Sequence, residues 1–463
     1  MNKSFQHFLR CLSLSSFLVV FFINISAQQP LSLHKALEAM EQYHPSLQVK
    51  QSLIKAAEAY VKQLKDQRLP SLQLMEQFTG GTDNGLNGSY FPMGIVPSTS
   101  GGKRATNESE LAMNNFLVSN LQWDFFNFGG YKANEAAASS LVETRKADLA
   151  QQDFYLRVTA TASYFSILKN QYLLKYSEDA AERLLGLQTA IKAYVVNGLK
   201  PGVDSSIANA ELSKARLNIL EAQKQLAIAK NELSLLTGID TLLIRADTVN
   251  APLMTQWPAL SFTDASANHP LVQYYESVYK NNQAFEKAIE KSNLPKLSLL
   301  SAAWLRSSSI DLYDKFHTFQ DPSFSNRYNY MAGVAMTYNL FEGKKRTDKL
   351  AVQQSETNAA LQNLTLQKEQ LESAGRQAAI NVRAALQKLD EIPIQLKAAA
   401  DAYTQKLTLY NSGLANIVDV VNAYYVLNRA ETDEVLAKDE YWKAVLQKAY
   451  TSNQFNQLLS ILK

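Results

Sequence analysis

Apolar residues recur in alternating steps of four and three over residues 208–236, which is the period of a coiled coil. Alanine alternates with a larger side chain through this series, which runs Ala208, Leu212, Ala215, Ile219, Ala222, Leu226, Ala229, Leu233 and Leu236. Small residues at every second position let the backbones of neighbouring helices approach closely. The pattern predicts a long helix over residues 203–237 with a seam along one face.

A second apolar stripe lies beside this seam, at Leu217, Leu220 and Ala227. A helix with two stripes can pack against a neighbour on each side, as in a closed ring of helices. The first seam recurs in the second half of the chain, with Glu434 as its exception, at Ala423, Leu427, Ala430, Ala437, Tyr441 and Ala444. An ordinary four-helix bundle explains one seam equally well, but it explains the length of the neighbouring helices badly.

These neighbouring helices are predicted to be unusually long. No proline occurs between Pro97 and Pro201, and residues 131–196 are rich in Ala, Leu, Lys, Glu and Gln. A helix of roughly 65 residues would extend about 100 Å, and such a length implies coiled-coil packing. Residues 344–411 have the same character except for Pro393, where we expect the helix to kink or break.

Four other segments alternate apolar and polar residues with the period of a strand, near residues 69–79, 112–126, 294–306 and 328–341. In the second of them the two faces carry different side chains, Leu117, Leu121, Trp123 and Phe125 against Asn120, Gln122 and Asp124. Such alternation is typical of strands with an apolar exterior and a polar lumen. It fits a half-buried soluble sheet almost as well.

The number of strands helps to decide between membrane strands and a soluble sheet. One chain offers about four strands, whereas barrels in membranes start at about eight. Unpaired strand edges cannot persist in lipid, because each exposed backbone group there costs several kcal/mol. If these strands lie in a membrane, the protein must therefore be an oligomer.

The chain also repeats itself. His44-Pro45 recurs as His269-Pro270, and Gly198-Leu199 recurs as Gly413-Leu414. The two copies differ by ten residues near residues 79–110 of the first copy, a segment that holds seven of the seventeen glycines. A glycine-rich surface loop tolerates such a length change well. The sequence therefore predicts two structural repeats.

The first repeat is predicted to span residues 28–250, with a strand hairpin at about 69–126 and long helices at about 131–196 and 203–237. The second is predicted to span residues 251–463, with a strand hairpin at about 294–341 and long helices at about 344–411 and 416–455.

The first 27 residues are predicted to be a secretory signal peptide. Lys3 and Arg10 precede an apolar stretch that ends at Ile25, and Ala27 provides a small residue for cleavage. A retained membrane anchor fits less well, because the stretch is broken by serines and is shorter than the ~20 residues that span a bilayer. Cys11, the only cysteine, lies inside this signal. The mature chain should therefore contain no disulfide and no thiolate metal site.

Composition and motifs argue against several functions. A net charge of +3 gives no reason to expect a nucleic-acid partner, because nucleic-acid binding usually shows as a clustered basic face. There is no phosphate-binding glycine loop, no nucleophile elbow and no metalloprotease pair of histidines. The five histidines are scattered, and His44 and His269 occupy equivalent positions in the two repeats. We predict neither catalytic residues nor a metal or cofactor.

The order and duplication of several motifs resemble the TolC-like outer membrane efflux proteins. The resemblance covers nearly the whole mature chain. Each copy has a hairpin of Tyr, Gly and Leu with an aspartate six residues after the glycine. The other motifs that carry the resemblance are His44-Pro45-Ser46-Leu47, Phe126-Asn127-Phe128-Gly129-Gly130 and Phe341-Glu342-Gly343.

This resemblance implies a mainly α protein with a β-barrel portion. Three copies would close a twelve-stranded outer-membrane β-barrel, continued by a periplasmic α-helical coiled-coil barrel. The implied function is a porin-like channel in the outer membrane, extending into the periplasm, that acts as a passive exit duct of a tripartite efflux system. The implied partners are a periplasmic adaptor (membrane fusion) protein, an inner-membrane transporter and the lipid of the outer membrane.

The resemblance also assigns site residues. Gly198, Leu199, Gly413 and Leu414 would form the adaptor-docking tip, whereas Asp204, Asp419 and Asn422 would line the periplasmic aperture. Structural roles compete with these assignments, because glycines end helices and aspartates near a helix start act as N-caps or first-turn acids. Two positions depart from the family pattern, since Asn422 replaces a second aspartate and Ala415 replaces a basic residue.

An alternative function is a soluble periplasmic coiled-coil scaffold or adaptor protein. The alternating aromatic strands and the glycine-rich loop favour the channel, because a scaffold would need neither.

Overall fold

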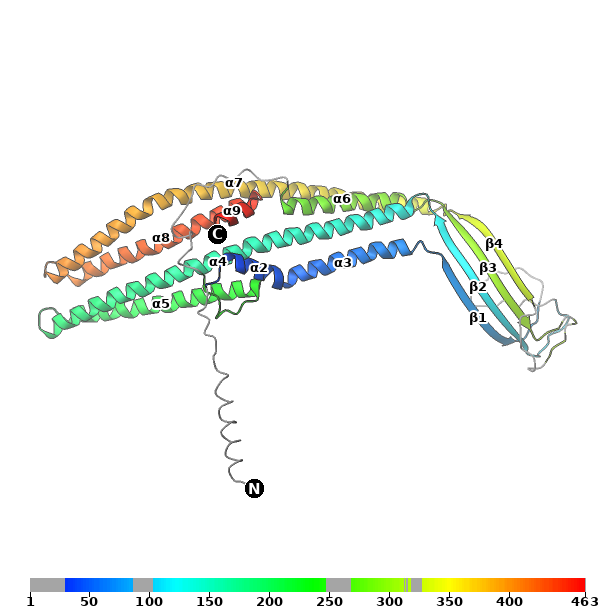
Figure 1. Ribbon diagram of the computed structural model, residues 1–463, viewed down its shortest axis with the longest axis horizontal. Coiled ribbons are helices and arrows are strands. Elements are labelled where there is room, and N and C mark those ends of the chain that lie inside the picture. The colour runs from blue at the N-terminus through cyan, green and yellow to red at the C-terminus, as the bar shows by residue number, and fades with distance from the viewer. Residues whose placement is uncertain are drawn as a thin grey trace, which may run out of the picture. The chain divides into compact units, whose positions relative to one another are not determined.

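The computed structural model describes residues 30–85, 103–246, 268–311, 313, 315–317 and 327–462. The predicted signal peptide with Cys11 lies outside the described residues, as does much of the glycine-rich loop. The helices and strands, labelled in Figure 1, are α2 (Leu33–Tyr43), α3 (Pro45–Asp66), β1 (Ser71–Gly81), β2 (Ala112–Phe126), α4 (Gly130–Val196), α5 (Gly202–Thr237), α6 (Pro270–Glu290), β3 (Lys296–Ser308), β4 (Arg327–Thr337), α7 (Glu342–Asn411), α8 (Ile417–Thr451) and α9 (Phe455–Ile461).

The described chain divides into two compact units. The first contains the described residues up to Val49, those within Leu149–Gln273, and those from Leu366 onward. The second contains those within Lys50–Asp148 and Tyr274–Thr365. Each unit therefore takes segments from both halves of the chain, so neither unit corresponds to one of the predicted repeats.

The second unit contains a single antiparallel sheet with strand order β1-β2-β3-β4. Its register pairs Leu72 with Leu121, and Leu299 with Val334, so one face carries most of the large apolar side chains. That apolar face comprises Leu72, Leu74, Leu117, Leu121, Trp123, Leu299, Leu305, Tyr328, Tyr330, Val334 and Met336. The opposite, more polar face carries Gln73, Gln77, Asn120, Gln122, Asp124, Ser298, Arg306, Asn329 and Thr337, together with the apolar Met75, Phe116, Val118, Leu300, Trp304 and Met331.

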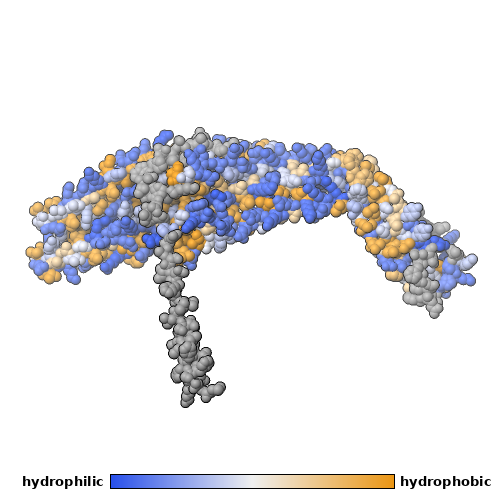
Figure 2. All heavy atoms as spheres, in the orientation of Figure 1, coloured by the Kyte–Doolittle hydropathy of each residue, from blue (hydrophilic) through white to orange (hydrophobic). Residues whose placement is uncertain are grey.

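The apolar face is open in the isolated chain. Leu72 is 69% exposed, Leu74 is 75% exposed and Tyr330 is 82% exposed, and Figure 2 shows apolar residues gathered over this part of the molecule. The predicted fourth strand was too long, since β4 ends at Thr337 and residues 338–341 connect it to α7. The sheet is therefore one layer with two chemically different sides.

The first unit is built from the long helices, and its core follows the predicted seam. All nine seam residues of α5 are buried or half-buried, whereas Leu217, Leu220 and Ala227 of the second stripe are exposed. In α8 the exception Glu434 accepts hydrogen bonds from the Tyr176 hydroxyl (2.8 Å) and the Lys438 ammonium (2.8 Å). These partners explain how a carboxylate occupies a position where the pattern calls for an apolar residue.

The helix α7 continues through Pro393. A kink or a break was expected there, and the structure shows no break. It runs without interruption over 70 residues. Proline cannot donate a hydrogen bond to the carbonyl of Leu389. Leu389 itself is only 2% exposed, so packing on this buried side of α7 maintains the helix despite the missing bond.

The repeated His-Pro pairs begin equivalent helices. The imidazole Nδ1 of His44 accepts a hydrogen bond from the Ser46 N–H (3.3 Å), and Nδ1 of His269 accepts one from the Leu271 N–H (3.1 Å). In each case the proline occupies the first helical position, where no N–H is needed. Both histidines therefore act as helix caps, which requires an unprotonated Nδ1.

His269 is fully buried, and its second ring nitrogen lies 3.0 Å from the Tyr450 carbonyl oxygen. Its ring makes edge contacts with the neutral rings of Phe154 and Tyr450. Burial lowers the pKa of His269 from its usual 6.5, against the smaller opposing effect of the Tyr450 carbonyl. The folded protein therefore favours the neutral ring.

The pH dependence of unfolding tests this arrangement. The unfolded state binds the His269 proton more readily, so the stabilisation is complete above pH 6.5 and is lost as the pH falls toward the lower pKa of the folded state. We expect the thermal unfolding midpoint to drop between pH 7.5 and 5.5, and His269→Gln to reduce that drop. His34→Gln is the control, because His34 is exposed and should leave the profile unchanged. An identical pH profile for His269→Gln would contradict the cap.

Candidate functional site

The helix α4 ends in a glycine turn. Gly198 has a φ of +71°, the Leu199 N–H donates to the Tyr194 carbonyl (2.8 Å), and the Gly198 N–H donates to the Val195 carbonyl (3.0 Å). This pair of bonds is the Schellman arrangement, which satisfies carbonyls that the helix end would leave unbonded. A side chain would meet no steric obstacle at Gly198, because the space around it is open. Glycine is therefore favoured here by the positive φ and not by close packing.

The helix α7 ends in the same way. Gly413 has a φ of +81°, the Leu414 N–H donates to the Leu409 carbonyl (2.8 Å), and the Gly413 N–H donates to the Tyr410 carbonyl (3.0 Å). The two turns lie at the same end of the first unit (Figure 1). Both glycines thus have the helix-ending role that the sequence allowed.

The leucines after these glycines point outward. Leu199 is 68% exposed and Leu414 is 77% exposed. Both are fixed in position by the backbone hydrogen bonds of the turns. The two ordered turns therefore each expose one large apolar side chain.

Asp204 is buried against the second half of the chain. It lies in the first turn of α5, after the N-cap Pro201, and only 8% of it is exposed. The Tyr410 hydroxyl donates to its carboxylate (3.0 Å), and the Lys200 ammonium lies 4.4 Å from the centre of the Tyr410 ring. Burial, together with the Asp204 carboxylate, raises the pKa of Tyr410 well above its usual range, so its hydroxyl stays protonated.

Asp419 has a different environment. It lies in the first turn of α8, and its N–H donates to the side chain of Asn416 (2.9 Å), so Asn416 is the N-cap. Asp419 is half-exposed and Asn422, three residues later, is exposed. Asp419 makes no ion pair within the described chain. The structure therefore brings Asp204 to Tyr410, and it leaves Asp419 and Asn422 accessible.

The sequence patterns assigned no functional role of their own to Tyr410 or Lys200. A signal for Tyr410 was present, because it continues a heptad series of α7 that runs Leu389, Leu396, Tyr403 and Tyr410, and a buried tyrosine hydroxyl needs a partner. Lys200 occupies the position in the first copy that Ala415 occupies in the second. The cation absent at Ala415 is thus present at the equivalent position of the other turn.

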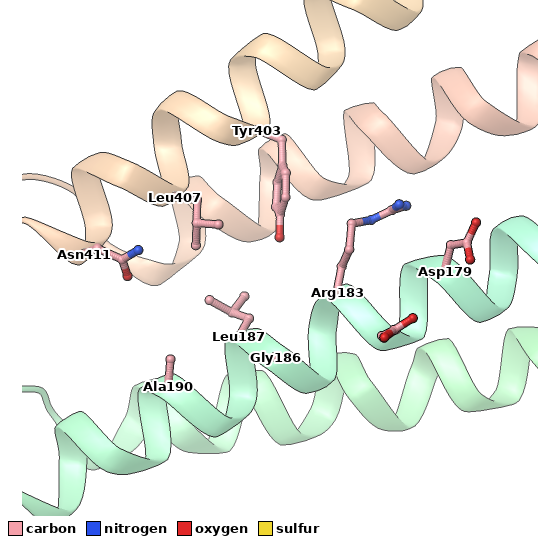
Figure 3. Close-up of a pocket in the computed structure, with 9 residues that line it drawn as sticks. Asp179, Arg183, Gly186, Leu187, Ala190, Tyr403, Leu407 and Asn411 are labelled. Atoms are coloured by element: carbon pink, nitrogen blue, oxygen red, sulfur yellow. The ribbon is translucent and has the colours of Figure 1, made fainter.

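A groove of about 570 Å³ lies between α4 and α7. Figure 3 shows Leu187 and Arg183 of α4 facing Tyr403 and Leu407 of α7. Arg183 forms an ion pair with Glu431 of α8 (2.5 Å). Burial raises the pKa of Glu431, and the Arg183 charge opposes that effect. The groove therefore has an apolar centre beside a half-buried ion pair.

The described residues show no features of a metal centre. No cluster of three His, Cys, Asp or Glu side chains able to hold a metal ion occurs among them. Within the same residues, no helix is both long enough and apolar enough to cross a membrane.

Comparison with solved structures identifies the fold as that of outer-membrane channels. The CusC structure matches with a TM-score of 0.73 and 15% identity over 91% of each chain. VceC of Vibrio cholerae matches with a TM-score of 0.70 and 17% identity over 90% of this chain and 95% of that chain. The MtrE outer membrane channel of Neisseria gonorrhoeae matches with a TM-score of 0.70 and 15% identity over 91% and 89%. At these identities the likeness shows the fold.

The sequence itself shows the family. The model of the family described as "Outer membrane efflux protein" matches residues 36–239 and 264–447. The chain belongs to the outer membrane efflux protein family, which confirms the resemblance seen in its motifs. None of the curated proteins matches the chain.

The Tyr410 hydroxyl provides a test of the contact between the two halves. Tyr410→Phe leaves the Asp204 carboxylate buried without that partner, which should cost about 1–3 kcal/mol of stability. We expect a lower thermal unfolding midpoint for this variant. Tyr403→Phe is the matched control, because Tyr403 is buried on the same face of α7 and donates no hydrogen bond to a described residue. Equal midpoints for the two variants would show that the hydrogen bond contributes nothing.

Proposed function

We propose that this protein is the outer-membrane channel component of a tripartite efflux or export system, in which three copies form a passive exit duct. The observation that carries the proposal is the one-layer sheet with an exposed apolar face, a more polar face and two unpaired edges. An apolar face this exposed is suited to lipid, and a polar opposite face is suited to a water-filled lumen.

The edges of the sheet support an oligomer. The edge strands β1 and β4 have 11 residues each. They run in opposite directions, because each strand is antiparallel to the next. The β4 strand of one copy can therefore pair with β1 of the next in an antiparallel ladder, and no edge stays open in lipid. Three copies, the number that the resemblance implies, give twelve strands.

The long helices support a ring in the periplasm. The second stripe of α5 is exposed, with Leu217 and Leu220 more than 60% accessible. On α7, exposed apolar residues recur every fourteen residues at Leu366, Ile380 and Ile394. Stripes with heptad spacing and no partner within the described chain are suited to packing against neighbouring copies. The helices would then form the coiled-coil barrel of the duct.

The two glycine turns are proposed as the surface that meets a periplasmic adaptor, which would connect the duct to an inner-membrane transporter. Gly198 and Gly413 shape the turns, and Leu199 and Leu414 provide the exposed contact. Support comes from their position at one end of the first unit.

The periplasmic aperture is proposed to include Asp419, Asn422 and Asp204. Asp419 and Asn422 are accessible and would each occur three times around the axis. A ring of carboxylates raises the local concentration of cations. Asp204 would act from behind this ring, because its carboxylate is hydrogen-bonded to Tyr410 of the same chain.

The same proposal includes the organisation of the chain. Residues 1–27 would direct export, and residues 28–250 and 251–463 would be the two repeats placed side by side in the wall of the duct. A soluble periplasmic scaffold or adaptor would leave the apolar sheet face in water, and a face of this kind would favour aggregation.

Charge placed on either face of β4 tests the orientation of the sheet. Ala332→Arg would put a cation midway along β4, on the same face as Val334 and therefore on the proposed lipid side. A cation there costs about 2–4 kcal/mol at the centre of the bilayer. We expect this variant to lose most of its trimer and its resistance to carbonate extraction. Ala335→Arg, three residues later on the more polar face, is the matched control and should assemble normally. A wild-type protein that is monomeric in mild detergent, or that carbonate removes from membranes, would refute the channel.

Ion selectivity in planar bilayers tests the aperture. Asp419→Ala removes a carboxylate from the proposed ring, so cation selectivity should fall. Asn422→Asp adds one, so cation selectivity should rise. The reversal potential under a salt gradient reports both effects. Channels with the same reversal potential in wild type and both variants would exclude these residues from the aperture.

A further inference from the structure

An apolar patch interrupts the more polar face of the sheet. We propose that this patch, together with two arginines beside it, binds amphiphilic anions as they pass along the lumen. Such solutes have an aromatic or apolar body and one acidic group. The inference rests on the proposed function, because it needs this face to line a duct, and it adds a substrate class to that function.

The apolar patch is continuous from strand to strand. Val118 of β2 lies directly opposite Met75 of β1 on one side and Trp304 of β3 on the other. Phe116 is the next residue on the same face of β2, and Met331 of β4 lies diagonally beside Trp304. Side chains at directly opposite and diagonal positions of a sheet are within reach of one another. These five residues therefore form one apolar surface.

The patch is open to an incoming molecule. Met331 is 62% exposed and Met75 is 43% exposed, whereas the other three residues are half-buried. Phe116, Val118 and Trp304 belong to the two central strands, so pairing between copies at the edges β1 and β4 would leave the centre of the patch uncovered. In a water-filled duct, an apolar solute that covers this surface is stabilised by the hydrophobic effect.

Two arginines lie beside the patch, in the row of residues nearer the end of β3. Arg306 lies directly opposite Phe116 on one side and Arg327 on the other. Like charges at directly opposite positions are destabilising, so an anionic group between the two arginines is favoured. A guanidinium has five N–H donors, so each arginine can bind an outside anion and also keep a partner within the chain.

Negative charge on this face lies far from the patch. Within the described strands, the only carboxylate on the face is Asp124. Asp124 lies at the opposite end of the sheet from the arginines, where it accepts a hydrogen bond from the Ser298 hydroxyl (2.6 Å). The arginines thus complement an acidic group, and the patch complements an apolar body. A solute with both groups makes two favourable contacts at once, whereas a small hydrophilic anion uses only the arginines.

Block of single channels in planar bilayers tests the site. The probes are naphthalenesulfonate, methanesulfonate and (naphthylmethyl)trimethylammonium, which separate the effect of the aromatic body from that of the negative charge. We expect naphthalenesulfonate to interrupt the current at a lower concentration than either of the other two. Trp304→Ala and Arg306→Gln should each raise its half-blocking concentration by about tenfold. Trp304→Phe keeps an aromatic ring and should retain most of the block.

Lys296→Gln is the matched control for charge. It removes a cation from the same face at the other end of β3, and it should leave the half-blocking concentration unchanged. Only assembled channels carry current, so a variant that fails to fold cannot be mistaken for one that has lost the site.

Equal block by all three probes, or unchanged block in both Trp304→Ala and Arg306→Gln, would overturn the proposal. A wild type that forms no channels refutes the duct and this site with it. Channels that conduct normally and show no block by naphthalenesulfonate lack only this site.

Discussion

The unsatisfied backbone groups along β1 and β4 are the constraint on which the structure depends. A single-layer sheet with one apolar face must put that face in lipid or against another surface, and in lipid its edges must be paired. One chain cannot meet both requirements. The helices have a similar need. The second apolar stripe of α5 and the exposed apolar residues at fourteen-residue spacing on α7 have no packing partner within the described part of the chain. In the proposed duct, neighbouring copies would complete both the sheet and the helices of each chain.

The long-period features of the fold were predictable from the sequence. Heptad spacing located α5 and its buried face, and strand alternation located all four strands to within a few residues. These patterns are strong because each is repeated many times along one element. The continuity of α7 through Pro393 was not predictable, since it depends on how packing compensates for one missing hydrogen bond.

The site was predictable only in part. The glycine turns followed from local backbone chemistry, because a left-handed residue after a helix favours glycine. The contact between Asp204 and Tyr410 joins residues separated by 206 positions, and no local pattern encodes such a pair. The cap formed by His269 shows the same limit, since its repeat with His44 was visible, whereas its burial among aromatic rings depends on the fold.

The unequal turns have a consequence for symmetry. Lys200 gives the first turn a cation that Ala415 does not give the second. In the proposed trimer six turns would surround the axis, but only alternate ones would carry the charge. The backbone of the rim would then have approximate sixfold symmetry, whereas its charges would have only threefold symmetry. A ring of six identical partner subunits would meet two kinds of turn. Adjacent subunits of that ring would therefore have to bind in inequivalent ways.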